Sequence, residues 1–456
     1  MTERLDREWP WIGLALGVLL LGHFVLAGPI EPPAKDALRY ADYALNIVEH
    51  NTFGLTSSDT GGGVRPGNAN APLYPILIAA VMQLDDSLVD SLTCAQNSVG
   101  RGLCPEHYTT LISVQYGVAW FSLMLLWAFA RLLLGRRELA LGVVVFALIS
   151  GAHLIYARRI LTEILVIPGF LLLQLALLLY WRQRRKRWAV MTGFALALLT
   201  LTRPEYLYLA LAIGLVSAAL VVRARSSFAV ASWVLGVLVC FSLLLPWAWR
   251  NHQHFDRWVL TDGGYGETIL AYRLSYNRMT LSEWGASFVY WLPDFGDKLA
   301  VGVLPEHSYR RFVSDNADAF TNTAVSDILQ PALQGMPREE ITAYWLRSEI
   351  FGNALQHGLV SVALTWRGLF VRKYWGLLGF VAYIGLLAAS LRGGRYEFAV
   401  LSLPVWFMVA FYAGVSVSVP RYNLPLVSLY AMGLGWYART LVSRWPRPRC
   451  RALESR

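Results

Sequence analysis

The stretch 35-KDALRYADYALNIVEHNTFG-54 is a polar segment between two strongly apolar ones, and its first half has the spacing of an amphipathic helix. Apolar and small side chains share one stripe of that helix, namely Ala37, Tyr40, Ala41, Ala44, Leu45 and Val48. Polar side chains lie off the stripe, at Asp36, Arg39, Asp42 and Asn46. We expect this helix to lie flat on a membrane surface or on the helices beneath it. Asp36 is at its N-terminal end, where free N–H groups favour an ionised carboxylate, either as a helix cap or as a functional group.

The rest of the chain is too apolar for a soluble protein. It has 456 residues, of which 56% are hydrophobic and 15% charged, and its mean hydropathy is +0.43. A soluble protein of this length needs far more charge to cover its surface. Apolar segments of about 20 residues recur, each long enough to cross a hydrocarbon core of about 30 Å. The sequence therefore predicts an all-α polytopic membrane protein, and the formal charge of +10 indicates topology rather than nucleic-acid binding.

We expect about ten membrane spans. The leader TERLDRE lacks the positive charge of a signal peptide, so the first span is predicted to remain uncleaved. The apolar segment 72–84 is too short to cross comfortably and is predicted to be re-entrant or interfacial. The predicted spans lie near residues 10–28, 109–133, 138–156, 163–181, 188–203, 205–222, 228–247, 375–391, 397–415 and 423–441.

Basic residues indicate the orientation of these spans. Most of the loop arginines and lysines fall on one side, in the loops 131–138, 181–188, 223–227 and 392–396 and in the tail 443–451. The positive-inside rule makes that side, with both termini, cytoplasmic. Three regions follow: a transmembrane core over 1–247 with a first outer loop at 29–108, an outward cap over 248–374, and C-terminal helices with a short tail over 375–456. No internal repeat is visible, which weighs against a transporter built from two inverted halves.

The first outer loop carries two cysteines, Cys94 and Cys104. In an oxidising space we expect this pair to form a disulfide, stabilising the fold by roughly 2–3 kcal/mol through loop closure. The alternative is two free thiols. Cys240, within a span, and Cys450, on the cytoplasmic side, are predicted to be thiols.

Charged side chains at the outward ends of spans are costly and need a partner or a role. Chain order lets four such positions converge on one outward cavity. They are Asp36, the turn YARRILTEI with Arg158, Arg159 and Glu163, the break LTLTRPEYLYL with Arg203 and Glu205, and the turn SVPRYNLPL with Arg421 and Tyr422. The alternative for each arginine is snorkelling to the interface, and for Glu163 an ion pair with a neighbouring arginine.

A cavity of carboxylates and guanidinium groups at the outer membrane face suits sugar transfer from a polyprenyl-phosphate donor. The leaving group is an anionic lipid phosphate, which needs electrostatic stabilisation more than a general acid. Arginine grips phosphate oxygens in a fork geometry. The attacking acceptor hydroxyl must lose its proton, for which one ionised Asp suffices, and an in-line displacement inverts the anomeric configuration.

An ordered series of short motifs along the whole chain resembles the GT-C family of membrane glycosyltransferases. The similarity is to its bacterial branch near the lipid A aminoarabinose transferase and the protein O-mannosyltransferases. The motifs are DALRYADYAL at 36–45, NAPLYPIL at 70–77, LTEI at 161–164, LTRPEY at 201–206, PWAWRNHQHFDRW at 246–258, TDGGYGE at 261–267 and PRYNLP at 420–425.

The resemblance implies a GT-C-like bundle and an inverting glycosyltransferase. It would move a sugar from a polyprenyl-phosphate donor to a lipid, glycan or protein acceptor on the outer face of the cytoplasmic membrane. Asp36 would be the base, and Glu163 would orient donor or acceptor. Arg421, Tyr422, Arg203 and Arg250 would contact the phosphate, and Arg39, Tyr40, Asn70 and Tyr74 would line the cavity. We expect no cofactor and no metal.

One departure concerns the donor. The aminoarabinose branch has a Lys before its proline pair, where this chain has Asn70. The donor contact that this Lys would make is either absent here or supplied by another residue, with Arg65 as the candidate. This departure weighs against an aminoarabinose donor.

Three other functions remain open at this point. A flippase of lipid-linked sugars would use the same arginines but would need coupling charges deep within its spans. A glycan polymerase or ligase would act on a diphosphate carrier without needing the Asp36 helix. The role of a non-catalytic scaffold would not depend on Asp36.

Overall fold

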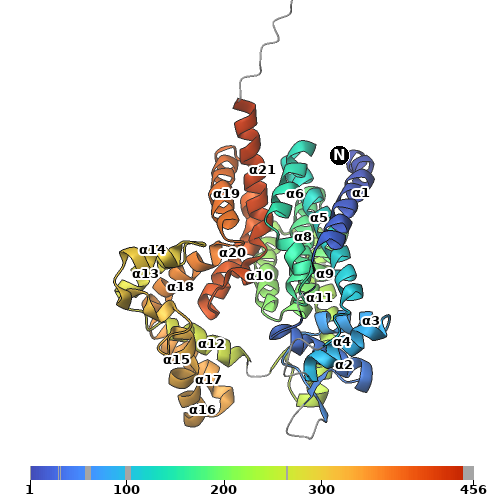
Figure 1. Cartoon of the computed structure of the whole chain (residues 1–456). Coiled ribbons are helices and arrows are strands. Elements are labelled where there is room, and N and C mark those ends of the chain that lie inside the picture. The colour runs from blue at the N-terminus through green and yellow to red at the C-terminus, as the bar shows by residue number, and fades with distance from the viewer. Residues whose placement is uncertain are drawn as a thin grey trace, which may run out of the picture.

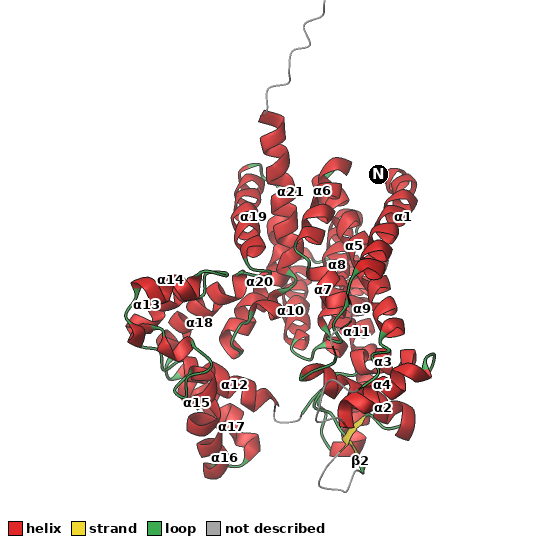
Figure 2. Cartoon of the chain, viewed as in Figure 1, coloured by secondary structure: helices red, strands yellow, loops and turns green. Residues whose placement is uncertain are grey.

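The computed structural model describes residues 2–28, 30, 32–56, 63–97, 104–262 and 265–444. Helices make up most of this part of the chain, and the two strands described form one short hairpin (Figure 2). The helices form an upright bundle, with two smaller assemblies at one end of it (Figure 1). The predicted all-α polytopic architecture is confirmed.

Seven helices in the described ranges are long and apolar enough to cross a membrane. They are α1 (Thr2–Leu26), α5 (Thr109–Leu134), α8 (Glu163–Gln183), α10 (Tyr206–Ala224), α11 (Ser227–Phe255), α19 (Tyr374–Arg392) and α20 (Glu397–Val415). The other three predicted spans fall on α6 (Arg137–Ile149), α9 (Lys186–Thr202) and α21 (Leu426–Arg444). These three stand in the same bundle (Figure 1), and a count of ten spans remains a prediction.

The expectation of one continuous span over 138–156 is wrong. The chain turns at Gly151, whose φ of +69° is easy for glycine and costly for other residues, and a short helix α7 (Ala152–Ala157) follows. The Ser150 hydroxyl, which donates to the carbonyl of Ala147 and accepts from the amide of Ala152, satisfies polar groups at this corner.

Close helix contacts in the bundle depend on glycines. A Cβ at Gly193 of α9 would lie 2.1 Å from the carbonyl oxygen of Gly236 in α11. A Cβ at Gly433 of α21 would lie 2.5 Å from the amide nitrogen of Tyr383 in α19. Small residues at such crossings let helix backbones approach in a membrane, where packing rather than water exclusion drives association.

The basic loops meet at the end of the bundle where α1 begins and α21 ends (Figure 1). Arg131 lies 3.2 Å from Glu8, and Arg182 donates to both the carbonyl of Leu132 and the carboxylate of Glu397, at 2.7 and 3.1 Å. The basic loops that end α5 and α8 and precede α20 therefore share one face with the N-terminal helix. The predicted tail beyond Arg444, with Cys450, lies outside the described residues.

The first outer loop folds at the opposite end. Its elements are α2 (Asp36–His50), β1 (Gly54–Thr56), β2 (Val64–Pro66), α3 (Leu73–Met82) and α4 (Asp86–Asn97). The strands pair antiparallel, with Leu55 opposite Arg65. The helix α3 is short, as the sequence indicated, and Cys94 is joined to Cys104 by a disulfide with a Cα–Cα distance of 5.6 Å.

The packed face of α2 differs from the predicted stripe at one polar residue. Asn46 is buried rather than exposed, because its amide donates to the carbonyl of Gly54 at 3.0 Å and so anchors the hairpin to the helix. Tyr43 is also fully buried, and its hydroxyl accepts from the amide of Ala69 at 3.2 Å.

The second outer loop folds into a helical cap, the yellow-to-orange assembly in Figure 1. It packs around its own small core of Leu270, Leu274, Ile341 and Trp345. Its helices are α12 (Tyr265–Tyr276), α13 (Leu281–Tyr290), α14 (Gly296–Val303), α15 (Phe320–Ala324), α16 (Gln330–Gly335), α17 (Arg338–Trp345) and α18 (Ala354–Leu369). The turns Glu306–Ser308 and Arg310–Phe312 are 3₁₀-helical, and Val325–Leu329 and Leu346–Phe351 are π-helical.

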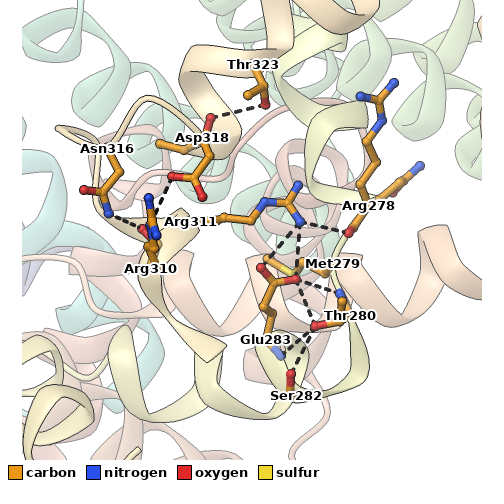
Figure 3. A network of polar contacts seen from close by, with 12 residues as sticks. Arg278, Met279, Thr280, Ser282, Glu283, Arg310, Arg311, Asn316, Asp318 and Thr323 are labelled. Carbon is orange, nitrogen blue, oxygen red and sulfur yellow. Dashed lines mark hydrogen bonds and ion pairs between the residues drawn. The ribbon is translucent and has the colours of Figure 1, made fainter. Parts of the chain in front are cut away.

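Two arginines organise the cap. Figure 3 shows Arg311 between Glu283 and the carbonyl of Arg278, at 3.4 and 3.3 Å, while Glu283 also completes the capping box of Thr280. Arg273 is fully buried and donates to the carbonyl of Ala413 in α20 at 2.7 Å. It therefore fastens α12 to the bundle.

Candidate active site

Asp36 is the first residue of α2, and it does not cap the helix. Lys35 precedes it with φ 53° and ψ −116°, and no side-chain cap is formed. The Asp36 carboxylate instead accepts from Arg421 Nη2 at 2.7 Å and from Arg39 Nη2 at 3.4 Å. Its side chain is 35% exposed, so one carboxylate at the end of the bundle opposite the basic loops is held by two guanidinium groups and is still open to solvent.

A second, buried pair lies beside it. Arg203 follows the last residue of α9, and Glu163 is the first residue of α8. Arg203 Nη2 donates to Glu163 Oε1 at 3.0 Å, and its Nε donates to the hydroxyl of Thr162 at 3.0 Å. Glu163 is 1% exposed, so the hydrogen bonds of this pair replace those that water would otherwise make with the carboxylate.

Arg421 connects the two pairs. It lies in the turn Pro420–Asn423 between α20 and α21, and its Nε is 3.8 Å from Glu163 Oε1. Although burial acts against it, the pKa of Arg421 is raised, because Asp36 accepts its hydrogen bond and the charge of Glu163 is close. The guanidinium is therefore a fixed positive charge between two carboxylates.

The ring of Tyr422 stacks with both guanidinium groups. Arg203 lies 5.3 Å and Arg421 5.4 Å from its centroid. Behind it, the hydroxyl of Tyr412 donates to Glu205 at 3.1 Å, and Glu205 lies 4.0 Å from Arg203. Three carboxylates and three arginines thus balance, and we refer to them as the outward ion cluster: Asp36, Glu163, Glu205, Arg39, Arg203 and Arg421.

Two predicted cavity tyrosines lie beneath Asp36. The rings of Tyr40 and Tyr74 contact edge to face, 5.3 Å apart. Burial raises the pKa of the Tyr40 phenol, against the opposing charge of Arg203 and a hydrogen bond with Thr162. The Tyr74 hydroxyl donates to Gln115 at 2.6 Å. Because Gln115 also donates to the carbonyl of Ala157 at 3.1 Å, α3, α5 and the turn before Glu163 form one support.

Arg250 lies outside the outward ion cluster. Its guanidinium donates to the carbonyls of Gly67 and Phe53, at 2.8 and 2.6 Å, on either side of the β1–β2 hairpin. Arg65 is exposed on β2, and Asn70 lies in the loop before α3. The predicted motif TDGGYGE includes residues 263 and 264, which lie outside the described part of the chain.

The two arginines of the turn after α7 have different surroundings. Arg158 donates to the carbonyl of Gly28 at the end of α1. The carbonyl of Arg159 accepts from Gln115 at 3.3 Å. Neither forms the ion pair with Glu163 that the sequence left open, because Arg203 and Arg421 are the ion-pair partners of that carboxylate.

Sequence reasoning missed the supporting polar residues Thr162, Gln115 and Tyr412. A usable signal existed for Gln115 and Tyr412, because polar side chains inside apolar spans are costly and mark sites. In the described part of the chain, no three His, Cys, Asp or Glu side chains gather as a metal site, and metal independence stays a prediction.

Comparison with known proteins shows the fold and no more. No sequence family model matches the chain, and no curated protein matches it by sequence. The crystal structure of ArnT from Cupriavidus metallidurans bound to undecaprenyl phosphate aligns with 96% of this chain and 62% of its own, at a TM-score of 0.50 and 12% identity. This chain therefore spans about three fifths of the length of that structure.

The apo structure of the same enzyme aligns with 94% of this chain and 78% of its own, at a TM-score of 0.39 and 13% identity. The alignment with the lipid-bound structure covers almost the whole chain. The chain is a multi-pass membrane protein with the GT-C-like fold of ArnT.

Proposed function

We propose that the protein is an inverting glycosyltransferase that moves a sugar from a polyprenyl-phosphate donor to a lipid, glycan or protein acceptor. It would act on the outer face of the cytoplasmic membrane, with both termini in the cytoplasm. The observation that carries the proposal is the Asp36–Arg421 pair joined to the buried Glu163–Arg203 pair. This cluster is at the end of the bundle opposite the basic loops.

The proposed reaction needs one base and a fixed positive charge. The acceptor hydroxyl oxygen attacks the anomeric carbon and its proton passes to the Asp36 carboxylate. The bond between the anomeric carbon and the phosphate oxygen breaks, and the electron pair leaves with the polyprenyl phosphate. The leaving phosphate gains one negative charge, which Arg421 stabilises. The Glu163–Arg203 pair and Tyr422 hold Arg421 in place for this step.

Arg421 would change partners when the donor binds. In the free protein its Nη2 donates to Asp36, which occupies both groups. A phosphate oxygen competes for the same donor, because Arg–phosphate pairs have the same fork geometry as Arg–carboxylate pairs. Binding of the donor would therefore release one Asp36 oxygen at the moment when a base is needed. Arg39, on the same helix, would remain as the ion-pair partner of the carboxylate.

The fold supports the choice of donor class. The structure with which this chain aligns contains undecaprenyl phosphate. In this chain the outward arginines can bind such a phosphate without a metal.

Transfer assays with several donors test the proposal. Membranes containing the protein would receive radiolabelled sugars on either a polyprenyl monophosphate or a diphosphate. We expect label to pass to an acceptor from a monophosphate donor only. Transfer from the diphosphate alone would indicate a polymerase or ligase. Labelled lipid crossing the bilayer without transfer would indicate a flippase, and neither event would indicate a scaffold.

A further inference from the structure

The turn between α18 and α19 holds an unusual pair of basic residues. Arg372 and Lys373 both have φ near +61°, and Lys373 has ψ −129°. Side chains other than glycine adopt these angles only where the surrounding structure holds them, and such residues gather at binding and catalytic sites. Lys35, immediately before Asp36, has nearly the same backbone angles. The backbone therefore has the same unfavourable conformation beside Asp36 and beside Arg372.

The Arg372 side chain crosses from this turn to the corner between α6 and α7. Its Nε donates to the carbonyl of Ser150 at 2.8 Å. Its Nη2 lies over Gly151, where a Cβ would be only 3.4 Å away. The hydrogen bond to Ser150 holds the guanidinium group at this corner, and the absence of a side chain at Gly151 leaves room for it. An arginine held in this way can present its remaining N–H groups to a ligand with little further loss of entropy.

Arg372 has no counterion in the part of the chain that the structure describes. Among the described residues no carboxylate lies within 4.0 Å of it, and neither Nη1 nor Nη2 donates a hydrogen bond. The outward ion cluster is internally balanced, so Arg372 adds an excess positive charge. Outward-facing arginines are unusual under the positive-inside rule, and this one is partly buried rather than snorkelling freely.

The end of α18 places this turn beside the turn of Arg421, because Asn423 donates to the carbonyl of Gly368 at 3.2 Å and Arg367 donates to the carbonyl of Val417 at 3.4 Å. Tyr156 of α7 lies within the electrostatic reach of both turns. Burial and the charge of Glu163 raise the pKa of its phenol, and Arg421, Arg372 and Arg159 oppose that rise. The pKa of this phenol is therefore affected by Glu163 and Arg421 of the cluster and also by Arg372 and Arg159. The excess charge of Arg372 therefore follows a helix end that contacts the turn carrying Arg421.

We propose that Arg372 is a second phosphate-binding residue of this site, which holds the carrier-lipid phosphate together with Arg421. This inference rests on the proposed function. The donor is a phosphodiester with one negative charge, whereas the released polyprenyl phosphate is a monoester with up to two. A guanidinium group that is fixed in place and lacks a counterion stabilises the charge that appears as the glycosidic bond breaks. Arg372 therefore favours the leaving phosphate over the intact donor.

Binding of undecaprenyl phosphate to the purified full-length protein tests this assignment without any transfer reaction. The loss of a charge-assisted hydrogen bond predicts that R372Q raises the Kd about tenfold to a hundredfold. R372K keeps the charge but loses the fork, and we expect about threefold to tenfold weaker binding. K373Q is the matched control, because Lys373 is exposed, ion-paired with Asp294 and next in the chain. Its Kd should stay within about twofold of the wild type.

Binding of undecaprenol, which lacks the phosphate, separates a ligand contact from a structural role. The inference expects R372Q and the wild type to bind undecaprenol equally, and equal loss of both ligands would overturn it. Undecaprenyl phosphate bound equally by wild type and R372Q would also overturn it, as would displacement of the bound lipid by equimolar phosphatidylglycerol. If R372Q does not fold, unchanged binding by R372K overturns the assignment.

The proposed function has a separate point of failure. A folded wild type that binds no undecaprenyl phosphate would contradict the proposed donor, and this inference with it. A wild type that binds the lipid phosphate but transfers no sugar would leave Arg372 as an anion site and reject only the transferase.

Discussion

Arg421 donates to Asp36 at 2.7 Å across 385 residues of chain, and this contact ties the turn between the last two helices to the first outer loop. The same contact occupies the two groups that sugar transfer would use, the base and the phosphate ligand. A substrate must therefore separate them. The pair acts as a placeholder that keeps both charges satisfied until a phosphate arrives.

Asp36→Asn removes the competitor for Arg421. We expect undecaprenyl phosphate to bind the variant about twofold to tenfold more tightly than the wild type, since a neutral amide holds the guanidinium less strongly than a carboxylate. The measurement is a direct binding titration in detergent. Asp42→Asn, on the same helix, is the control, because Asp42 binds Thr56 and Asn46 instead. Weaker binding by Asp36→Asn would contradict the exchange of partners.

The Glu163–Arg203 pair should dominate the stability of this end of the bundle. Glu163→Gln leaves Arg203 without its closest carboxylate in a buried site, which costs about 3–5 kcal/mol. Equilibrium unfolding in detergent measures this loss. Glu205→Gln, more exposed and 4.0 Å from the same arginine, should cost less than about 1 kcal/mol. The double variant Glu163→Gln with Arg203→Gln should lose less than the sum of the two single variants.

A variant of Arg250 tests whether this residue supports the β1–β2 hairpin or binds the phosphate. Its contacts with Gly67 and Phe53 predict that Arg250→Lys speeds hydrogen exchange in the β1–β2 hairpin, since the two carbonyls lose one fork-shaped donor. The Kd for undecaprenyl phosphate should change by less than about threefold. Unchanged exchange together with a large loss of binding would instead support the direct phosphate contact that the motif PWAWRNHQHFDRW indicated.

The joint between cap and bundle should weaken in acid. Burial, aided by the charge of Arg273, lowers the pKa of His357 in α18 from 6.5 to about 4. Between these values the unfolded chain binds a proton that the folded protein does not, so stability rises with pH and is lost as pH falls from about 6.5 to about 4. Thermal unfolding across this window should show the loss. It should be smaller in His357→Asn and unchanged in the exposed control His254→Asn.

Sequence patterns predicted the parts of the fold that follow from local chemistry. The length and apolarity of the spans identified the bundle. Charged residues at the ends of spans identified the three site residues: Asp36 follows the first span, Arg203 precedes Pro204, and Arg421 follows Pro420. Their convergence followed from counting spans, because each turn falls on the same side. The helix α3 was recognisable because ten apolar residues are too few to cross the bilayer.

Other features depend on contacts that no local pattern encodes. Helical spacing alone places Asn46 on the solvent-exposed face of α2. Its burial follows from a contact with the hairpin that begins eight residues later. The break at Gly151 interrupts an apolar run that reads as one span. Only the fold shows that Arg250 donates to the hairpin carbonyls, whereas Arg372 donates to the carbonyl of Ser150 and has no carboxylate within 4.0 Å among the described residues.

The most direct test of the central claim is single-turnover sugar transfer in membranes, with radiolabelled polyprenyl-phosphate sugars and matched amounts of wild type and Asp36→Asn. If Asp36 is the base, the variant should bind the donor and transfer label at least about a hundredfold more slowly than the wild type. Equal rates of transfer by the two proteins would contradict this account and leave Glu163 as the remaining carboxylate to examine.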